Sequence, residues 1–289
     1  AYPILLGKRD IIEKLIEEYN IELENAIIID PKCDEEKERR GLFGKEFFQK
    51  RMRKGMTEFE AIQIMRERNH FGAMMVEMGD ADAMVSGITR NYRDVVRPAL
   101  QVVGLQKDIT KIAGMYILNT KKGPLFLADT TINLNPTAED LAEITSNVAK
   151  TIRKFKVTPR IALLSYSNFG SSIGDDAKKM SKAVKLLREN DPNLIVDGEV
   201  QANFALNNDL MNEQFSFSTL ANKKVNTLIF PNLSSGNIAY KLLQEMTEGD
   251  AIGPILVGLK KSIHVLQLGS SVREIINMVK VAVVDAQNK

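Results

Sequence analysis

The chain of 289 residues carries 39 basic and 37 acidic side chains, so its formal net charge is only +2. With 44% hydrophobic residues it can bury one large core or two medium ones, and its length favours two domains. The balanced charge argues against a disordered chain and against nucleic-acid binding through bulk charge. We therefore expect no nucleic-acid partner. No apolar run approaches the roughly 18 residues of a membrane span, so we expect no membrane partner either.

The cysteine and histidine content limits metal and redox chemistry. Cys33 stands alone and the chain has two histidines, so no internal disulfide forms and a typical zinc site cannot be built. We therefore expect no metal site in this chain and a reducing, cytoplasmic location. The chain starts at Ala1 without an initiator Met or a signal peptide, which fits either processing or excision from a longer polypeptide.

Short apolar runs alternate with segments of helical periodicity along almost the whole chain. Strands are predicted at 4–6, 26–29, 81–85, 114–119, 125–128, 161–165, 194–196, 227–230, 252–257 and 264–268. Helices are predicted at 10–19, within 31–54, from 57 to a break near 70 and on to 78, and at 93–103, 136–155, 175–190, 236–246 and from 272 onward. This alternation is typical of parallel sheets covered by helices on both faces.

Local signals mark several helix ends. Thr57 and Ser271 each precede a glutamate by three residues, the pattern of a capping box. Asn135 followed by Pro136 predicts a capping residue and the first helical residue. Gly79 predicts a helix end in the left-handed conformation.

The loops after the predicted strands are rich in glycine, small hydroxylated residues, asparagine and aspartate. They are 79–89, 129–137, 165–174, 232–237 and 269–271. Ligands of open parallel sheets bind beyond the carboxyl ends of the strands, and free N–H groups at helix starts favour anions. We therefore predict a cleft for an anionic ligand, although ordinary turns use the same residue types. The chain lacks GxxxxGK[ST], GxGxxG and GxSxG, which argues against a P-loop NTPase, a usual dinucleotide fold and an α/β-hydrolase.

Isolated charged residues are more ambiguous. Arg93 and Arg97 can share one helix face and, with Arg90, clamp a phosphate; a solvated face with salt bridges explains them equally well. His264 lies inside an apolar run, and we interpret it as a core histidine rather than a base.

Longer motifs resemble the phosphate acetyl/butyryltransferase family and follow the order found in that family. They are GDADAMVSG at 79–87, RPALQ at 97–101, AD at 128–129, NPTAE at 135–139, LLSYS at 163–167, DGEVQ at 197–201, FPNL at 230–233, GNIAY at 236–240 and AIGPIL at 251–256. The resemblance implies an α/β fold of two three-layer α/β/α lobes with mainly parallel sheets, similar to isocitrate/isopropylmalate dehydrogenase. The cleft between the lobes would hold coenzyme A. We place the first lobe at 1–108 plus 262–289, and the second, with dimer contacts, at 109–261.

One departure from the family bears directly on catalysis. Active members carry Ser-Arg-Gly after the last strand and an acidic residue five positions later, which the resemblance assigns to transition-state stabilisation, phosphate binding and proton abstraction. The matching positions here are Gln267, Leu268 and Glu274. Leucine neither carries charge nor donates a hydrogen bond, and losing one such group typically costs ~10²–10³ in rate. We therefore expect no catalytic residue at these degenerate positions, with Glu274 serving the capping box.

The same pattern resembles the C-terminal phosphotransacetylase-like domain of large bacterial NADP-dependent malic enzymes, as do PILLG at 3–7 and SVREIINM at 271–278. This implies a regulatory, oligomer-forming domain that binds acetyl-CoA or a related acyl-CoA. It would be linked covalently to malic enzyme domains, and NADP and a divalent metal would bind only in those missing parts.

By motif position we expect ligand contacts from both lobes. They are Ser86, Thr89, Arg90 and Arg97 from the first lobe, and Asn133, Ser165, Ser167 and Asn168 from the second. Two alternatives stay open. One is an active phosphate acetyl/acyltransferase that recruits Arg90 or Arg273 as a substitute cation, and the other is a dimerisation scaffold with an empty cleft.

Overall fold

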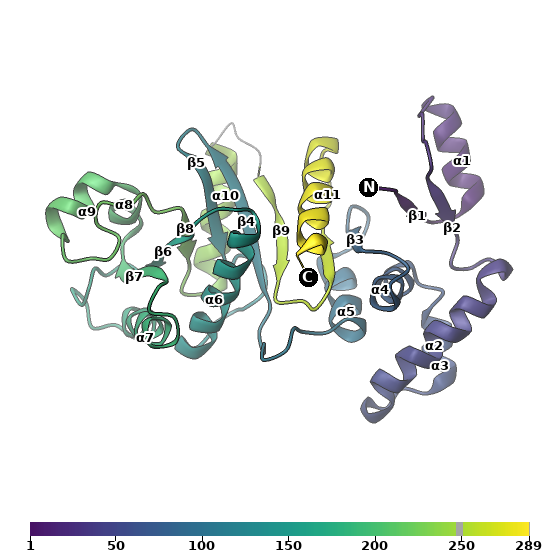
Figure 1. The fold of residues 1–289 in the computed structure, drawn as a ribbon, viewed down its shortest axis with the longest axis horizontal. Helices are drawn as coiled ribbons and strands as arrows, with labels where there is room; N and C mark the ends of the chain where they lie inside the picture. The colour runs from purple at the N-terminus through teal and green to yellow at the C-terminus, as the bar shows by residue number, and fades with distance from the viewer. Residues whose placement is uncertain (247–250, 289) are drawn as a thin grey trace.

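The computed structural model describes residues 1–246 and 251–288, and its largest sheet has six strands (Figure 1). In spatial order the strands are β7 (Ile195–Val200), β6 (Arg160–Leu164), β8 (Thr227–Ile229), β5 (Gly123–Ala128), β4 (Ala113–Thr120) and β9 (Ala251–Val257). The pairs from β7 to β5 are parallel, whereas β4 runs antiparallel to both β5 and β9. The predicted α/β fold with mainly parallel sheets is confirmed.

Helices cover both faces of this sheet because its strands alternate apolar side chains between the two sides. In β5, Phe126 and Ala128 join one core cluster, and Leu125 and Leu127 join the other. The first cluster is covered by α6 (Ala138–Lys154), α7 (Asp175–Asn190) and α11 (Val272–Gln287). The second is covered by α8 (Ala202–Leu206), α9 (Asn208–Gln214) and α10 (Leu233–Met246). The result is a three-layer arrangement around the six-stranded sheet.

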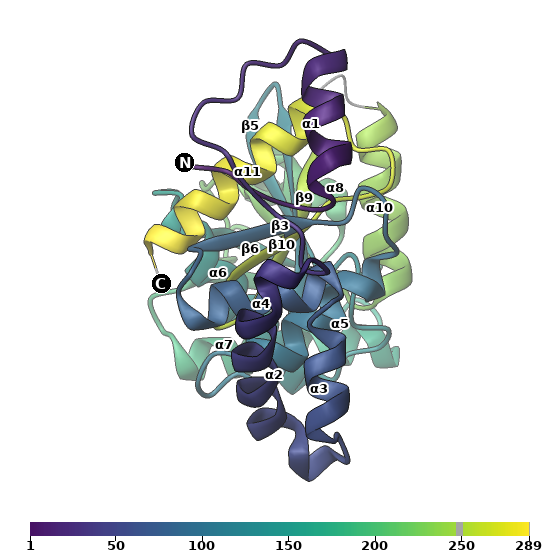
Figure 2. The same ribbon diagram turned by 90° about the vertical axis from the view of Figure 1, so that its right-hand side faces the viewer.

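The remaining elements form a second part with smaller sheets, whose helices face the viewer in Figure 2. β1 (Ile4–Leu6) pairs in parallel with β2 (Ile27–Ile29), and β3 (Ala83–Ser86) pairs in parallel with β10 (Ser262–Val265). The helical elements are α1 (Arg9–Glu18), η1 (Asp34–Glu36), α2 (Lys37–Arg51), η2 (Met52–Lys54), α3 (Glu58–Ile64), α4 (Arg68–Met78) and α5 (Tyr92–Val102). The strands of this part form two separate pairs rather than one continuous sheet.

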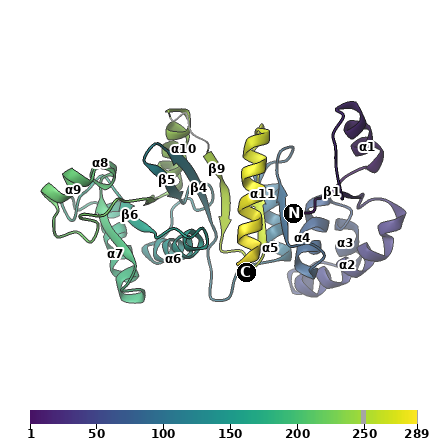
Figure 3. The same cartoon turned by 45° about the horizontal axis from the view of Figure 1, so that its top comes forward.

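Two chain segments that connect the parts lie side by side. Leu105 and Leu259 form an isolated bridge, and the Lys260 N–H donates to the Gly104 carbonyl at 3.1 Å. Helix α11 also spans the junction, because it packs on β3 and β10 of one part and on β9 of the other (Figures 1 and 3). The proposed boundaries between 108 and 109 and between 261 and 262 fall next to these segments and stay a prediction.

The capping boxes at Thr57 and Ser271 are confirmed, each hydroxyl accepting from the glutamate N–H three residues later at 3.2 Å. The cap predicted at Asn135 is wrong. Helix α6 instead begins after Thr137, whose hydroxyl accepts from the Asp140 N–H at 3.1 Å while the Asp140 carboxylate accepts from the Thr137 N–H. Two orphan N–H groups are satisfied in this way, which one asparagine cap does not achieve.

The end of the last predicted strand is also wrong. Strand β10 stops at Val265, so Gln267 and Leu268 lie in the loop before α11. Strand alternation therefore does not set their side-chain positions: the Gln267 side chain is held by hydrogen bonds to Tyr116 and Tyr240, and the Leu268 side chain is exposed. Within the described ranges, every helix is too short or too polar to traverse a lipid bilayer.

Two glycines of α2 offer a matched test of the packing between α2 and α3. A Cβ at Gly44 would lie 2.7 Å from the Ile62 Cα, whereas a Cβ at Gly41 meets no atom within 4 Å. We expect Gly41→Ala to raise the free energy of unfolding by about 0.5–1 kcal/mol through helix propensity. We expect Gly44→Ala to lower it by about 1–3 kcal/mol through overpacking. Urea unfolding followed by circular dichroism measures both, and stabilisation by Gly44→Ala would contradict the close α2–α3 contact.

Candidate functional site

The loop after β5 is organised by the buried carboxylate of Asp129. Its Oδ1 accepts from the N–H groups of Gly114 and Thr131 at 2.9 and 3.0 Å, and its Oδ2 accepts from the N–H of Asn133 at 2.7 Å. The Asn133 Nδ2 donates to Asp129 Oδ2 at 2.6 Å and to the Ile112 carbonyl at 2.8 Å. Both amide hydrogens of Asn133 are thus engaged, one with Asp129 in the loop and one with Ile112 before β4, so only its Oδ1 is available to a ligand.

The loop after β6 is held in the same manner by Glu199, a buried residue of β7. Its Oε1 accepts from the Ser167 hydroxyl at 3.1 Å and from the Gly170 N–H at 2.6 Å. The Asn168 Oδ1 accepts from the Gln201 N–H at 2.8 Å, and the Ser165 hydroxyl accepts from the Ser167 N–H at 3.3 Å. Ser167 is fully buried and shapes the loop, whereas Ser165 and Asn168 are partly exposed.

The candidate ligand residues of the first lobe divide into one anchored and three exposed side chains. Ser86, at the end of β3, donates to the Asn69 Oδ1 at 2.8 Å. Thr89 and Arg90 lie in the turn before α5, and Arg97 lies on α5 itself; all three are exposed. Within the described part of the chain, these three side chains make no hydrogen bond or ion pair, so both guanidinium groups are available to an anion.

A cluster of Tyr116, Tyr240 and Gln267, here called the tyrosine cluster, lies where the two parts meet. The rings of Tyr116 on β4 and Tyr240 on α10 stack with centroids 4.2 Å apart, and both residues are buried. The Gln267 Nε2 donates to the hydroxyl of Tyr116 and, at 3.1 Å, to that of Tyr240. Burial raises the pKa of Tyr116, and the neighbouring Tyr240 and Glu274 raise it further, so the phenol stays protonated at neutral pH.

Tyr92 brings a third segment to this junction. It is the first residue of α5, and its hydroxyl lies 3.1 Å from the Thr131 Oγ1 in the Asp129 loop. Burial raises the pKa of Tyr92, and the charge of Asp129 adds to the effect. Helix α5, the loop after β5 and the segment before α11 therefore meet around the side chains of Tyr92, Tyr116 and Tyr240.

The degenerate positions surround the start of α11. Leu268 is 66% exposed in the turn that follows Gln267. The Glu274 Oε2 accepts from the Ser271 N–H at 2.7 Å, and the Gln267 N–H donates to the Ser270 hydroxyl at 3.2 Å. A helix N-terminus favours a nearby negative charge, and at α11 this charge is supplied by the chain's own Glu274.

His264 is confirmed as a core residue. It is fully buried in β10, where its Nε2 lies 3.2 Å from the Ser262 Oγ and 3.4 Å from the Asp285 Oδ2. Since both contacts involve the same ring nitrogen, they do not form the relay of a serine hydrolase, in which serine and aspartate bind opposite nitrogens.

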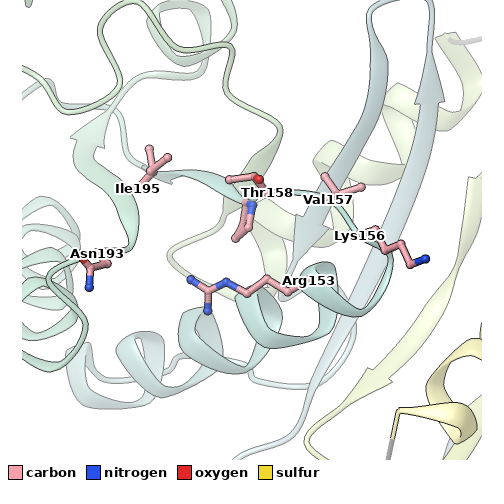
Figure 4. Close-up of a pocket in the computed structure, with 7 residues that line it drawn as sticks. Arg153, Lys156, Val157, Thr158, Asn193 and Ile195 are labelled. Atoms are coloured by element: carbon pink, nitrogen blue, oxygen red, sulfur yellow. The ribbon is translucent and has the colours of Figure 1, made fainter.

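Two surface pockets lie elsewhere. One of about 250 Å³ opens at the amino ends of β6 and β7, on the side of the sheet away from the loops described above (Figure 4). Its Arg153 points toward Asn193 and lies 3.6 Å from the Asp191 carboxylate, while Lys156 points away. The other, of about 360 Å³, lies beside α1 and β2 and is lined mainly by acidic side chains. None of the candidate ligand residues lines either pocket, and neither offers converging positive charge.

Several of the residues that shape this site have no predicted role in the sequence. Asp129, Glu199 and Tyr240 fall inside the family motifs, which mark their segments but not their contacts. Tyr116 lies in an apolar strand whose pattern indicates only burial. In the described residues, no group of three or more His, Cys, Asp or Glu side chains is arranged to hold a metal ion.

Comparison with known proteins places this geometry in context. The chain is 37% identical over 291 residues to the NADP-dependent malic enzyme of Escherichia coli, covering 100% of the chain but 38% of that protein. It is 34% identical to the phosphate acetyltransferase of Bacillus subtilis, covering 98% of the chain and 86% of that protein. The structure matches a phosphotransacetylase from Streptococcus pyogenes with a TM-score of 0.89 and 34% identity, over 100% of this chain and 87% of that one. The chain thus spans well under half the length of the malic enzyme it matches.

Likeness to dehydrogenases is much weaker. A putative 4-hydroxythreonine-4-phosphate dehydrogenase from Salmonella typhimurium matches with a TM-score of 0.52 at 13% identity, which supports only the general fold. By contrast, the family model described as phosphate acetyl/butaryl transferase matches residues 1–283. The chain therefore belongs to the phosphate acetyl/butyryltransferase family.

Proposed function

We propose that this chain is a phosphotransacetylase-like regulatory and oligomerisation domain of an NADP-dependent malic enzyme, and that it binds acetyl-CoA in a degenerate active-site cleft. The relatives include both malic enzymes and phosphate acetyltransferases, so family membership alone does not choose between regulation and catalysis. The proposal rests on the three positions that the resemblance assigns to phosphate chemistry.

At those positions the chain offers neither a cation nor a free base. Leu268 is apolar and exposed, and the Gln267 amide is engaged with two tyrosine hydroxyls. Glu274 caps α11, so its carboxylate stands where an incoming phosphate would meet the helix N-terminus. The negative charges of the Glu274 carboxylate and of phosphate repel each other, so phosphate binding at this site is disfavoured.

Recognition of coenzyme A is supported by the exposed cations of the first lobe. Arg90 and Arg97 are exposed and carry no partner among the described residues, which leaves them available for the phosphates of the ligand. Across the junction, the partly exposed Ser165 and Asn168 belong to a loop whose shape Glu199 fixes. The ligand would thus contact both parts and favour one arrangement of them, with a coupling that is typically ~1–3 kcal/mol.

Oligomerisation is supported by an exposed apolar row on α10. Ile238, Leu242 and Met246 recur every four residues and are 59%, 57% and 80% exposed. Such a contiguous row is typical of an interaction face, here assigned to a homo-oligomer through the second lobe. The linked malic enzyme domains would hold NADP and the divalent metal, and we place the protein in the cytoplasm.

The alternative is an active phosphate acetyltransferase. It is supported by relatives with that activity in their names, such as the phosphate acetyltransferase of Clostridium acetobutylicum, 33% identical over 99% of the chain. In this alternative Arg90 or Arg273, an exposed residue of the first turn of α11, supplies the missing positive charge.

An exchange assay and calorimetry separate these functions. With acetyl phosphate and coenzyme A, we expect turnover ~10²–10³ below that of an active phosphate acetyltransferase assayed in parallel, because the phosphate-binding cation is absent. Isothermal titration with acetyl-CoA should show saturable binding. Turnover at the pace of the active enzyme would establish the alternative, and absence of binding would leave only a scaffold.

Arg97 tests the position of the ligand. We expect Arg97→Ala to weaken acetyl-CoA binding by about tenfold or more, since it removes a charged partner of a phosphate group. Lys150→Ala, at an exposed position on α6, removes the same net charge far along the chain from α5 and should leave the affinity unchanged. Equal affinities for both variants would remove Arg97 from the site.

A further inference from the structure

We propose that an exposed apolar row on helix α1, formed by Ile11, Leu15 and Tyr19 and here called the α1 row, is the surface on which the linked malic enzyme domains of the same polypeptide dock. This inference rests on the proposed function and assigns the surface of this chain that contacts those domains.

The α1 row lies along one side of the helix. Ile11 and Leu15 are four residues apart in α1, and the Tyr19 N–H donates to the Leu15 carbonyl at 3.0 Å, so the tyrosine continues the row by one turn. The three side chains are 50%, 44% and 67% exposed. The segment that follows adds Ile21 and Leu23, which are also exposed. An exposed apolar surface of this kind, bordered by charged residues, is typical of protein–protein contacts.

Helix α1 lacks the packing that stabilises the other long helices. All other helices of ten or more residues in the described chain contain buried residues, whereas α1 contains none. Its best-covered side chains, Ile12 and Ile16, are only partly buried, and β1 and β2 form a sheet of two strands. Because helices shorter than about 12–15 residues are marginal in water without packing, α1 needs a further partner.

The connection along the chain selects the malic enzyme domains as this partner. The resemblance is to a C-terminal domain, so in the proposed function these domains are joined ahead of residue 1. Most of the Escherichia coli malic enzyme lies outside the matched 38%. Strand β1 begins at Ile4 and α1 at Arg9, both close to this joint (Figure 1). Domains tethered so near to the α1 row are present beside it at an effective concentration on the order of millimolar.

The charges around the α1 row define the chemistry of the docking partner. Residues 8–24 hold six acidic and three basic side chains. One of the basic side chains, Arg9, pairs with Glu13 at 3.6 Å within the helix. The border of the row is therefore negative, and the complementary surface of the malic enzyme domains is apolar with a border of Lys and Arg. The same negative border disfavours an anionic membrane surface, which attracts basic helices.

The α1 row is separate from the other surfaces assigned to function. Helix α10, which carries the row assigned to the homo-oligomer, lies against the six-stranded sheet and far from α1 in Figure 1. The candidate ligand residues lie in or after β3, β5 and β6, and none belongs to α1, β1 or β2. Docking through the α1 row therefore competes neither with acetyl-CoA nor with a second copy of the chain.

Amide hydrogen exchange measured by mass spectrometry tests the inference on two proteins, the 289-residue chain and the complete polypeptide that also holds the malic enzyme domains. We expect the amides of residues 11–19 to exchange about tenfold or more slowly in the complete polypeptide, because burial of a leucine stabilises the helix by at least this factor. Leu15→Lys should remove this protection, since it places a cation against the basic border. In the 289-residue chain the same variant should change the exchange little, because a cation is favoured near a helix C-terminus.

Leu42→Lys is the matched control, because Leu42 is 53% exposed on α2, outside the α1 row. It should retain the protection of residues 11–19 in the complete polypeptide. Equal exchange of these residues in the two wild-type proteins would overturn the inference, whether or not Leu15→Lys folds. Protection already present in the 289-residue chain, with a lower mass of its Leu15→Lys variant in light scattering, would assign the row to a second copy and overturn the inference as well.

The outcomes separate this inference from the proposed function. A complete polypeptide that carries the malic enzyme domains and binds acetyl-CoA, but exchanges residues 11–19 as fast as the 289-residue chain, overturns only the docking surface. A complete polypeptide without malic enzyme domains overturns the proposed function, and the docking surface with it.

Discussion

A single side-chain amide, that of Gln267, ties the segment before α11 to strand β4 and helix α10. It donates to the hydroxyls of two stacked, buried tyrosines, and these bonds lie where the two parts of the chain meet. Moving the segment would leave polar groups unpaired in a poorly solvated environment, which is costly. The places of Leu268 and Glu274 follow from this anchor, because the chain passes directly from Gln267 into the capped start of α11.

The chemistry of the junction follows from its charge. Two tyrosine side chains and an amide occupy the interior, and the Glu274 carboxylate of the α11 capping box is engaged with Ser271. The exposed arginines Arg90 and Arg97 lie apart from them, in the loop and the helix after β3. The family frame is thus retained while the charge at position 268 is lost, and this combination favours ligand sensing over phosphate chemistry.

Much of the frame follows from the sequence because it depends on neighbours along the chain. The short apolar runs become the strands of the six-stranded sheet, and the serine–glutamate and threonine–glutamate pairs cap helices where the pattern places them. The sequence also indicates the loops at the strand ends. What it does not indicate is how Asp129 and Glu199 hold those loops, since their partners lie in other elements.

The tyrosine cluster is the clearest case of this limit. Tyr116 and Gln267 are 151 residues apart in the chain. Strand β10 ends at Val265, and the Gln267 side chain in the following loop donates to the Tyr116 hydroxyl. The sequence predicts a strand as far as Leu268 because the prediction uses only the hydrophobicity of neighbouring residues. Tertiary hydrogen bonds decide where the strand stops, and with it which side chains reach the junction.

The most direct measurement of the central claim is the rate of acetyl phosphate formation from acetyl-CoA and phosphate by the double variant Gln267→Ser, Leu268→Arg, beside the wild type. If the wild type is inactive because it lacks a cation at position 268, its rate of acetyl phosphate formation should be at background level. The rate of the variant should then exceed that of the wild type by ~10² or more. A wild type that already forms acetyl phosphate at the pace of an active phosphate acetyltransferase, with no gain in the variant, would contradict the account.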